Sequence, residues 1–243
     1  MIVDTHELIP GRPDSGLLIV ADHASSRVPE GLDLGICPTV LDRHVAIDIG
    51  VEPLVRLLAA RLEATAVVAR LSRLIVDFNR EEDAPGLIPH VSDGIAIPGN
   101  AALCAQRRED RLIRYHRAYH GALAGLVEEN APALIVSVHS FTPRLETRPE
   151  EQRPWQVGVL YNRDDQAARI AIPMLEAQGW MVGDNQPYSG RDLNYTMNRH
   201  AEGNDIPYLG LEIRQDGIAD PAGVERWATH LEPVIRSVRD MFA

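Results

Sequence analysis

The sequence predicts a single α/β domain over residues 1–243, with a mostly parallel or mixed central sheet and helices on both faces. Short apolar segments without alternation of polar residues are typical of strands that are buried on both faces. Longer segments with helical periodicity separate them, which is the order of a parallel sheet with crossover helices. The 243 residues, 45% of them hydrophobic, show no internal repeat and no convincing linker, so one domain is the simplest interpretation.

Six apolar segments are expected to be strands, because each is short and is bounded by polar or turn-forming residues. They are residues 17–21, 66–69, 74–77, 134–138, 157–161 and 208–213. Helical periodicity predicts helices at residues 38–63, 101–129, 165–178 and 221–242. Segments rich in Pro, Gly and charged residues predict long loops at residues 81–100, 142–154 and 183–195.

The net charge of −11 disfavours nucleic acid and anionic lipid as partners, because an acidic surface repels both. Small anionic molecules stay open as partners, since a local group of arginines can outweigh a distant negative surface. No apolar run approaches the ~20 residues of a transmembrane helix, and the first residues lack the features of a signal peptide. We therefore expect a cytoplasmic protein in which Cys37 and Cys104, its two cysteines, stay reduced.

Polar or titratable residues stand at the ends of several predicted strands. His23, His139 and Glu212 each lie at or near the end of one strand, and the run from Asp77 to Arg80 follows another. One such residue alone is commonly a turn former or a helix cap. Ligands of parallel sheets bind beyond the carboxyl ends of the strands, so four such ends together predict a functional site.

These residue types fit metal-assisted hydrolysis. Two histidines and one carboxylate, with one open position, form a catalytic Zn²⁺ site. Such a metal lowers the pKa of water to ~7 and polarises a carbonyl group. A glutamate that is not a ligand can take the proton of that water, and arginine can bind a substrate carboxylate. We expect His23 and His139 to be metal ligands and Glu212 to be the catalytic base.

Five blocks of the sequence resemble the N-formylglutamate amidohydrolases. They are DHASSRVP at 22–29, SRLIVDFNR at 72–80, VHS at 138–140, PYSG at 187–190 and LEIR at 211–214. The second block is also similar to one in the succinylglutamate desuccinylases and aspartoacylases. The resemblance implies a phosphorylase/hydrolase-like fold of the zinc-carboxypeptidase kind. It also implies a metal-dependent amidohydrolase that releases formate or another small acid from an N-acyl amino acid such as N-formylglutamate.

The third metal ligand does not follow from the resemblance. The desuccinylase relatives take a carboxylate three residues after the first histidine, and this chain has Ser26 there. The alternatives are Asp22, Asp42 and Asp48, of which Asp42 stands in an Asp-x-His element similar to one in the family. We favour Asp48, because a charge in an otherwise apolar stretch needs a metal or an ion-pair partner. An ion pair inside the fold is the other interpretation.

The substrate carboxylate is expected to bind arginine, whose planar guanidinium matches a carboxylate. Arg80 is the first candidate because it adjoins Asn79 in the shared block, and the two residues are expected to hold this carboxylate or the oxyanion. Further candidates for the substrate site are Arg73, Arg191 and Arg214. His200 has a counterpart in the resembled family and is expected to contact substrate or the developing oxyanion.

Other polar residues fit alternative functions less well. His116 and His120 are four residues apart on a predicted helix, but no glutamate stands between them as in a zincin motif, so a place beside the substrate pocket or simple packing is expected. Ser25 and Ser140 lack the Gly-x-Ser-x-Gly setting of a serine hydrolase. Two rival functions stay open: a deacylase or peptidase with a larger substrate, and a metal- or ligand-binding protein without hydrolytic activity.

Overall fold

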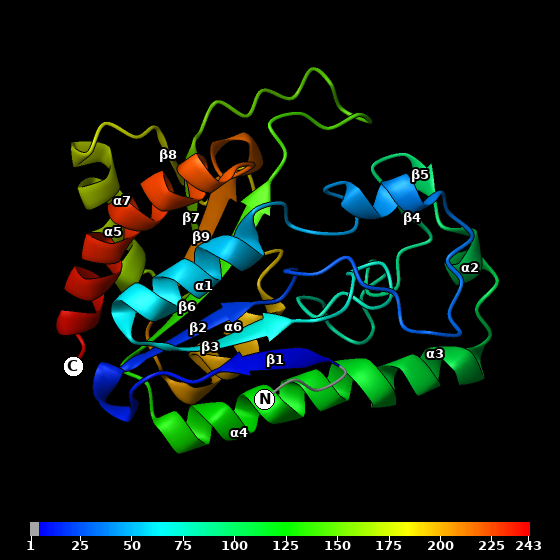
Figure 1. The fold of residues 1–243 in the computed structure, drawn as a ribbon, viewed down its shortest axis with the longest axis horizontal. Coiled ribbons are helices and arrows are strands. Elements are labelled where there is room, and N and C mark those ends of the chain that lie inside the picture. Colours follow the sequence, from blue (N-terminus) through cyan, green and yellow to red (C-terminus); the bar gives the residue numbers. More distant parts are fainter. Residues whose placement is uncertain (1–4) are drawn as a thin grey trace.

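A computed structural model describes residues 5–243 of the chain. At its centre is a seven-stranded sheet with the strand order β1-β3-β2-β6-β9-β7-β8 (Figure 1). The strands are β1 His6–Ile9, β2 Leu17–Ala21, β3 Thr65–Ala69, β6 Leu134–Phe141, β7 Val157–Leu160, β8 Val182–Asp184 and β9 Tyr208–Arg214. A separate small hairpin consists of β4 Val91–Ser92 and β5 Ile95–Ala96.

Helices cover both faces of the sheet (Figure 1). One face is covered by α1 Val51–Leu62, α5 Gln166–Ala177 and α7 Pro221–Asp240. The other face is covered by α4 Ala118–Asn130 and the short α6 Tyr195–His200. Two further helices, α2 Pro98–Ala101 and α3 Ala105–Arg111, precede α4, and a π-helical turn, Leu112–Arg117, joins α3 to α4. No helix within residues 5–243 is both long and apolar enough to cross a membrane.

The sheet is mixed, with a parallel centre. The pairs β2–β3, β2–β6, β6–β9 and β7–β8 are parallel, whereas β1–β3 and β7–β9 are antiparallel. Every residue of β2, β3 and β6 is buried, which explains why these strands show no alternation in the sequence. The predicted α/β fold with a mixed sheet and helices on both faces is confirmed.

The prediction of a strand at residues 74–77 is wrong. Leu74, Ile75 and Val76 are fully buried, but Leu74 and Ile75 lie in a turn and none of the three joins a strand. Side chains replace the missing strand partner: Asn100 Nδ2 donates to the carbonyl of Leu74 at 2.8 Å, and Arg111 Nη1 donates to the carbonyl of Ile75 at 3.0 Å. A buried apolar run is therefore not diagnostic of a strand when side chains satisfy its backbone.

The predicted helix at residues 38–63 is helical in its second half. A 3₁₀ turn, Pro38–Asp42, comes first, and α1 begins only at Val51. Gly50 stands between them with φ of 81°, where a Cβ would come within 2.2 Å of the carbonyl oxygen of Ile218. This interruption carries Asp48 away from a helical face and toward the carboxyl edge of the sheet.

The other differences concern short elements and the ends of helices. The loops predicted at 81–100 and 183–195 contain the β4–β5 hairpin and the end of β8, and β1 was not predicted. Each of these strands has four residues or fewer, which is too short for a clear periodicity. The helix predicted at 101–129 begins four residues later and contains the π-helical turn. Cys37 and Cys104 are exposed and form no disulfide.

Candidate metal centre and catalytic pocket

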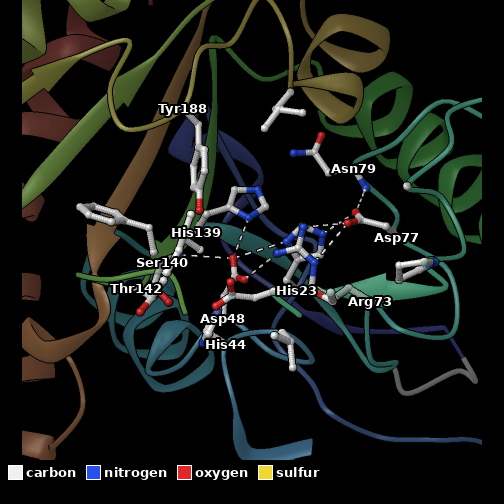
Figure 2. Close-up of a pocket in the computed structure, with 18 of the residues that line it drawn as sticks. His23, His44, Asp48, Arg73, Asp77, Asn79, His139, Ser140, Thr142 and Tyr188 are labelled. Atoms are coloured by element: carbon white, nitrogen blue, oxygen red, sulfur yellow. Dashed lines mark hydrogen bonds and ion pairs between the residues drawn. The ribbon is translucent and has the colours of Figure 1, made fainter. Parts of the chain in front are cut away.

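Three buried side chains from distant parts of the chain converge beside the carboxyl ends of β2 and β6 (Figure 2). Among the described residues, His23, Asp48 and His139 are the one group of potential metal ligands, with ligand atoms that all lie within 4.8 Å of one another. Oδ2 of Asp48 lies 2.9 Å from Nδ1 of His139 and 3.4 Å from Nδ1 of His23. The structure thus brings together the three residues that the sequence analysis favoured as ligands.

The local backbone explains why Asp48 reaches this position. The amide of Asp48 donates to the carbonyl of His23 at 2.9 Å, which ties the turn before α1 to the turn after β2. The amide of Ser140 donates to Oδ2 of Asp48 at 3.3 Å, and the hydroxyl of Ser140 donates to the carbonyl of Ile49. By contrast, Asp42 is exposed at the surface and is not part of this group.

A second layer of carboxylates orients the two imidazoles. Nε2 of His23 donates to Oδ1 of Asp77 at 2.7 Å, and Nε2 of His139 lies 3.6 Å from Oδ2 of Asp22. The other oxygen of Asp22 accepts a hydrogen bond of 2.7 Å from the hydroxyl of Tyr119. Carboxylates in this position fix the ring and the tautomer of a ligating histidine and make it a better ligand. Asp22 therefore stands behind a ligand, and Asp48 is the carboxylate that faces the centre.

Arg73 connects the two layers. Its Nη1 lies 3.3 Å from Oδ1 of Asp48, and its Nη2 lies 2.7 Å from Oδ2 of Asp77. The Arg73 guanidinium is therefore already engaged by two carboxylates, although it lines the pocket as predicted. Its contacts indicate that it holds Asp48 and Asp77 in place.

The charges around the two imidazoles favour a cation. Burial by itself would lower the pKa of His139, but the adjacent carboxylates of Asp22 and Asp48 raise that pKa well above its ordinary value. Burial would raise the pKa of Asp48, yet the neighbouring His23 and His139 hold it below its usual range. Nδ1 of His23 is buried and has no hydrogen-bond partner within residues 5–243. Two nitrogen donors, one of which is this unpaired atom, and one carboxylate oxygen fit a divalent metal such as Zn²⁺.

Glu212 lies beside this centre with a free oxygen. The parallel register of β6 and β9 pairs His139 with Glu212, so that the two side chains are neighbours at the pocket. Glu212 is 7% exposed, and in the described part of the chain its Oε2 has no hydrogen-bond partner. Burial, together with the nearby negative charge of Asp48, raises the pKa of Glu212 to about 7. A carboxyl group with such a pKa can take up and release a proton near neutral pH.

These residues line a cavity of about 350 Å³. Figure 2 shows Tyr188 and Asn79 on opposite sides of it, above the group formed by His23, Asp48 and His139. Arg80 also lines the cavity, and its Nε lies 4.0 Å from Oδ2 of Asp77, which is its one ion pair among the described residues. The guanidinium of Arg80 is therefore far less engaged than that of Arg73, and it can take a carboxylate from outside.

Three predicted site residues lie elsewhere. Arg191 is exposed at the surface and does not line the pocket. Arg214 lies at the end of β9 and donates to the carboxylate of Asp216 and the carbonyl of Pro154, also outside the pocket. His200 is buried in α6, where it contacts His120 rather than the cavity.

Tyr188 lines the pocket, although no sequence signal assigned it a role. Its block, PYSG, was recognised, but a tyrosine within a turn gave no further signal. Nη1 of the buried Arg153 donates to the Tyr188 hydroxyl at 2.9 Å, which fixes the ring from behind. Burial raises the pKa of Tyr188, so that its hydroxyl keeps its proton and can donate a hydrogen bond into the cavity. Arg153 lies in the predicted loop 142–154 and carried no motif.

Comparisons with known proteins show the family and the fold to which the chain is similar. The family model for N-formylglutamate amidohydrolase matches residues 15–219. The structure of the gene product Atu2144 from Agrobacterium tumefaciens has 28% sequence identity and a TM-score of 0.92, over 98% of this chain and 96% of that one. The fold is also similar to that of N-formylglutamate amidohydrolase from Ralstonia eutropha JMP134, at 18% identity and a TM-score of 0.74 over 99% and 98% of the two chains. The curated proteins contain no match.

The family match covers most of the chain, including every residue of the candidate centre. It makes the protein a hydrolase of the amidohydrolase type. By this match, the chain belongs to the N-formylglutamate amidohydrolase family.

Proposed function

We propose that the protein is a metal-dependent amidohydrolase that removes the acyl group from a small acidic N-acyl amino acid such as N-formylglutamate. The observation that carries this proposal is the free, buried carboxylate of Glu212 next to the group formed by His23, Asp48 and His139. Burying an unpaired carboxylate costs free energy. A role as proton acceptor beside a metal site would explain why the chain keeps one here.

His23, Asp48 and His139 would hold the metal, and Zn²⁺ suits their donor atoms. When bound there, the ion supplies a Lewis acid that acidifies water and polarises the scissile carbonyl group. Glu212 takes the proton from the attacking water and later delivers it to the leaving amine. One residue can perform both steps, because its pKa lies near neutral pH.

The substrate is held by residues around the cavity. Arg80 binds the carboxylate of the amino acid, since its guanidinium has one weak ion pair within the described chain. The side-chain oxygen of Asn79 accepts from the amide of Thr196 at 3.0 Å, so its NH₂ group is the part that can donate to substrate. The Tyr188 hydroxyl, held by Arg153, is placed to donate to the developing oxyanion.

The cavity also favours a second candidate substrate. Its volume of about 350 Å³ lies within the ~300–1,000 Å³ range of pockets for drug-sized ligands, so that it has room for more than a formyl group. Val45, Pro89 and Leu145 contribute apolar surface to its lining. We therefore include N-acyl amino acids with a larger acyl group among the substrates to test.

The proposal is tested by metal analysis of the purified protein and a screen of N-formyl and N-acyl amino acids, before and after chelation. We expect about one metal ion per chain and an activity that chelation abolishes and added Zn²⁺ restores. The variant Glu212→Gln should bind the metal but hydrolyse about 10²–10⁴ times more slowly. Activity that is indifferent to chelation would refute the metal mechanism, and a metal-loaded protein without any turnover would favour a binding protein.

A further inference from the structure

A second group of buried histidines lies outside the pocket, on the other side of the segment Phe78–Arg80. His116 lies in the π-helical turn, His120 in α4 and His200 in α6. Their side chains are 0%, 0% and 2% exposed. None of them lines the cavity, and the proposed mechanism does not use them.

Two of these imidazoles bind the backbone of the segment that carries Asn79 and Arg80. Nε2 of His120 lies 2.9 Å from the carbonyl oxygen of Phe78, and Nε2 of His116 lies 2.9 Å from the carbonyl oxygen of Arg80. A carbonyl oxygen can only accept a hydrogen bond. Both histidines must therefore carry their proton on Nε2.

The tautomer of His120 determines that of His200. With its proton on Nε2, neutral His120 has a lone pair on Nδ1, and Nε2 of His200 lies 2.9 Å from that atom. His200 must therefore be the donor and also carry its proton on Nε2. Burial lowers the pKa of His120 to about 3 and that of His200 to about 4, which keeps both rings neutral at physiological pH.

α6 adds further contacts to the same segment. The amide of Thr196 donates to Oδ1 of Asn79 at 3.0 Å, and its hydroxyl donates to the carbonyl of Phe78 at 3.4 Å. The amide of Asn79 donates to Oδ1 of Asp77, the oxygen that also accepts from His23. The segment is thus held on one side by histidines and on the other by the candidate metal centre.

The group is unsuited to a second metal. Nε2 of His120 and of His116 is used by a backbone carbonyl, and Nδ1 of His120 accepts from His200. The nearest carboxylate, that of Glu82, lies 3.9 Å from Nδ1 of His116 and is bound by Arg117. Nδ1 of His116 is buried and keeps an unpaired lone pair among the described residues. A metal site needs several donor atoms that converge on one point, and in the described part of the chain these histidines belong to no such group.

We propose that His116, His120 and His200 are positioning residues, which fix the backbone of Phe78–Arg80 and thereby the direction in which Asn79 and Arg80 face the substrate. The role of Arg80 rests on the proposed function, whereas the hydrogen bonds of the histidines do not. A π-helical turn at this point fits the proposal, because such turns occur frequently at functional sites and change the direction of the side chains that follow. This role also replaces direct contact with substrate as the function of His200.

The first test compares His116→Leu with His116→Gln. Glutamine carries an N–H donor where histidine has Nε2, whereas leucine fills the space without a donor. We expect His116→Leu to raise KM for an acidic N-acyl amino acid about tenfold with kcat within about threefold, and His116→Gln to stay within about twofold of wild type. Metal content should not change in either. His230→Leu, in which a half-buried histidine of α7 is removed far from the pocket, is the control.

Equal KM values for His116→Leu, His116→Gln and wild type would overturn the proposal, because the donor would then not matter. An equal rise of KM in His116→Leu and His116→Gln would also contradict it, because the effect would then come from packing alone.

A second test needs no turnover, so it distinguishes failure of this proposal from failure of the proposed function. Long-range ¹H–¹⁵N NMR of the imidazoles should show His120 and His200 as neutral Nε2–H tautomers from about pH 5.5 to pH 8, and His116 as a neutral Nε2–H tautomer at about pH 8. Hydrogen exchange at the amide of Asn79 should be faster in His116→Leu than in His116→Gln. An Nδ1–H tautomer at His120, or a charged His120 at pH 6, would refute the proposal even if the enzyme is fully active.

Discussion

The protein contains two groups of buried histidines with opposite electrostatics. His23 and His139 have carboxylates on both sides of their rings, and these raise their pKa values although burial would lower them. His116, His120 and His200 are bound by backbone carbonyls or by one another, and burial lowers their pKa values. Burial is similar in the two groups, so the partners decide whether a histidine attracts a cation or stays neutral.

The comparison also separates what each group can do. An imidazole between carboxylates, with a lone pair that has no partner, can bind a metal ion. The imidazoles of His116 and His120 donate to carbonyls and belong to no group of potential metal ligands among the described residues, so their hydrogen bonds hold those carbonyls in place. The segment Phe78–Arg80 lies between the two groups, since Asp77 contacts His23 and the next residues contact His116 and His120.

The largest expected effect comes from removing a member of the first group. His139→Gln takes away one nitrogen ligand and leaves Asp22 and Asp48 without a cation between them, so metal binding and hydrolysis should both be lost, with activity down about a thousandfold or more. Metal content by mass spectrometry and initial rates check this. His200→Gln, the matched change in the second group, should keep a full complement of metal. Loss of metal in both variants would abolish the distinction between the groups.

A smaller effect on metal binding is expected when a carboxylate that accepts a hydrogen bond from a ligand histidine is changed. Asp77→Asn keeps the size of the side chain but removes the charge that stabilises His23 as a ligand. Metal affinity should fall about 10- to 100-fold, and activity should recover at high metal concentration. Competition with a chelator of known affinity measures the change. An unaltered affinity would show that Asp77 does not act through His23.

The arginines predicted for the substrate site should differ by a similar factor in their effect on KM. Arg80→Ala should raise KM for an acidic substrate about 10- to 100-fold, because the guanidinium lines the cavity and has one weak ion pair among the described residues. Arg191→Ala and Arg214→Ala should stay within about twofold of wild type, since both side chains lie outside the cavity. Steady-state kinetics with a substrate and its amide analogue provide the check. A large effect at Arg214 would contradict the site as described.

The smallest effect concerns the stability of the metal-free protein and its dependence on pH. The pKa of Glu212 is raised from 4.5 to about 7, so the folded chain binds more protons than the unfolded chain between these values. The contribution of Glu212 to stability is therefore fully present below pH 4.5 and is lost as the pH rises through about 7. Wild type should therefore lose on the order of 3 kcal/mol of unfolding free energy between pH 5 and pH 8, and Glu212→Gln should not show this loss.

Urea unfolding of metal-free wild type and metal-free Glu212→Gln at pH 5 and at pH 8 measures this difference in stability. Glu202→Gln is the matched control, because Glu202 is also buried but its pKa is lowered, by hydrogen bonds from the backbone amides of Asp164 and Arg163 and from the Arg163 side chain, which outweigh its burial. Its substitution should therefore cost stability at pH 8 rather than add to it. The same sign in both variants would refute the charge argument for Glu212.

The sequence by itself determined the class of the fold and the end of the sheet where the site lies. Fully apolar runs at 17–21 and 134–138 require burial on both faces, which makes them central strands, and the residues that follow them are then placed at one edge. His23, His139 and Glu212 could be named for this reason, and the family resemblance followed from the same blocks. Short edge strands such as β8 gave no such signal. The apolar run at 74–77 gave a misleading one, because side chains and not a neighbouring strand bind the carbonyls of Leu74 and Ile75.

Only the tertiary structure decided which carboxylate and which arginine belong to the site. The sequence favoured Asp48 but left Asp22 and Asp42 open. In the structure Asp48 faces both histidines because the helix begins late, at Val51. Arg73 and Arg80 stand in one block, but the first is neutralised by two carboxylates and the second is not. His200 carries a resemblance to a catalytic position, yet its ring is engaged by His120. Whether a charged group can bind a ligand depends on the charges within a few ångströms of it. Those neighbours come from segments far apart in the chain.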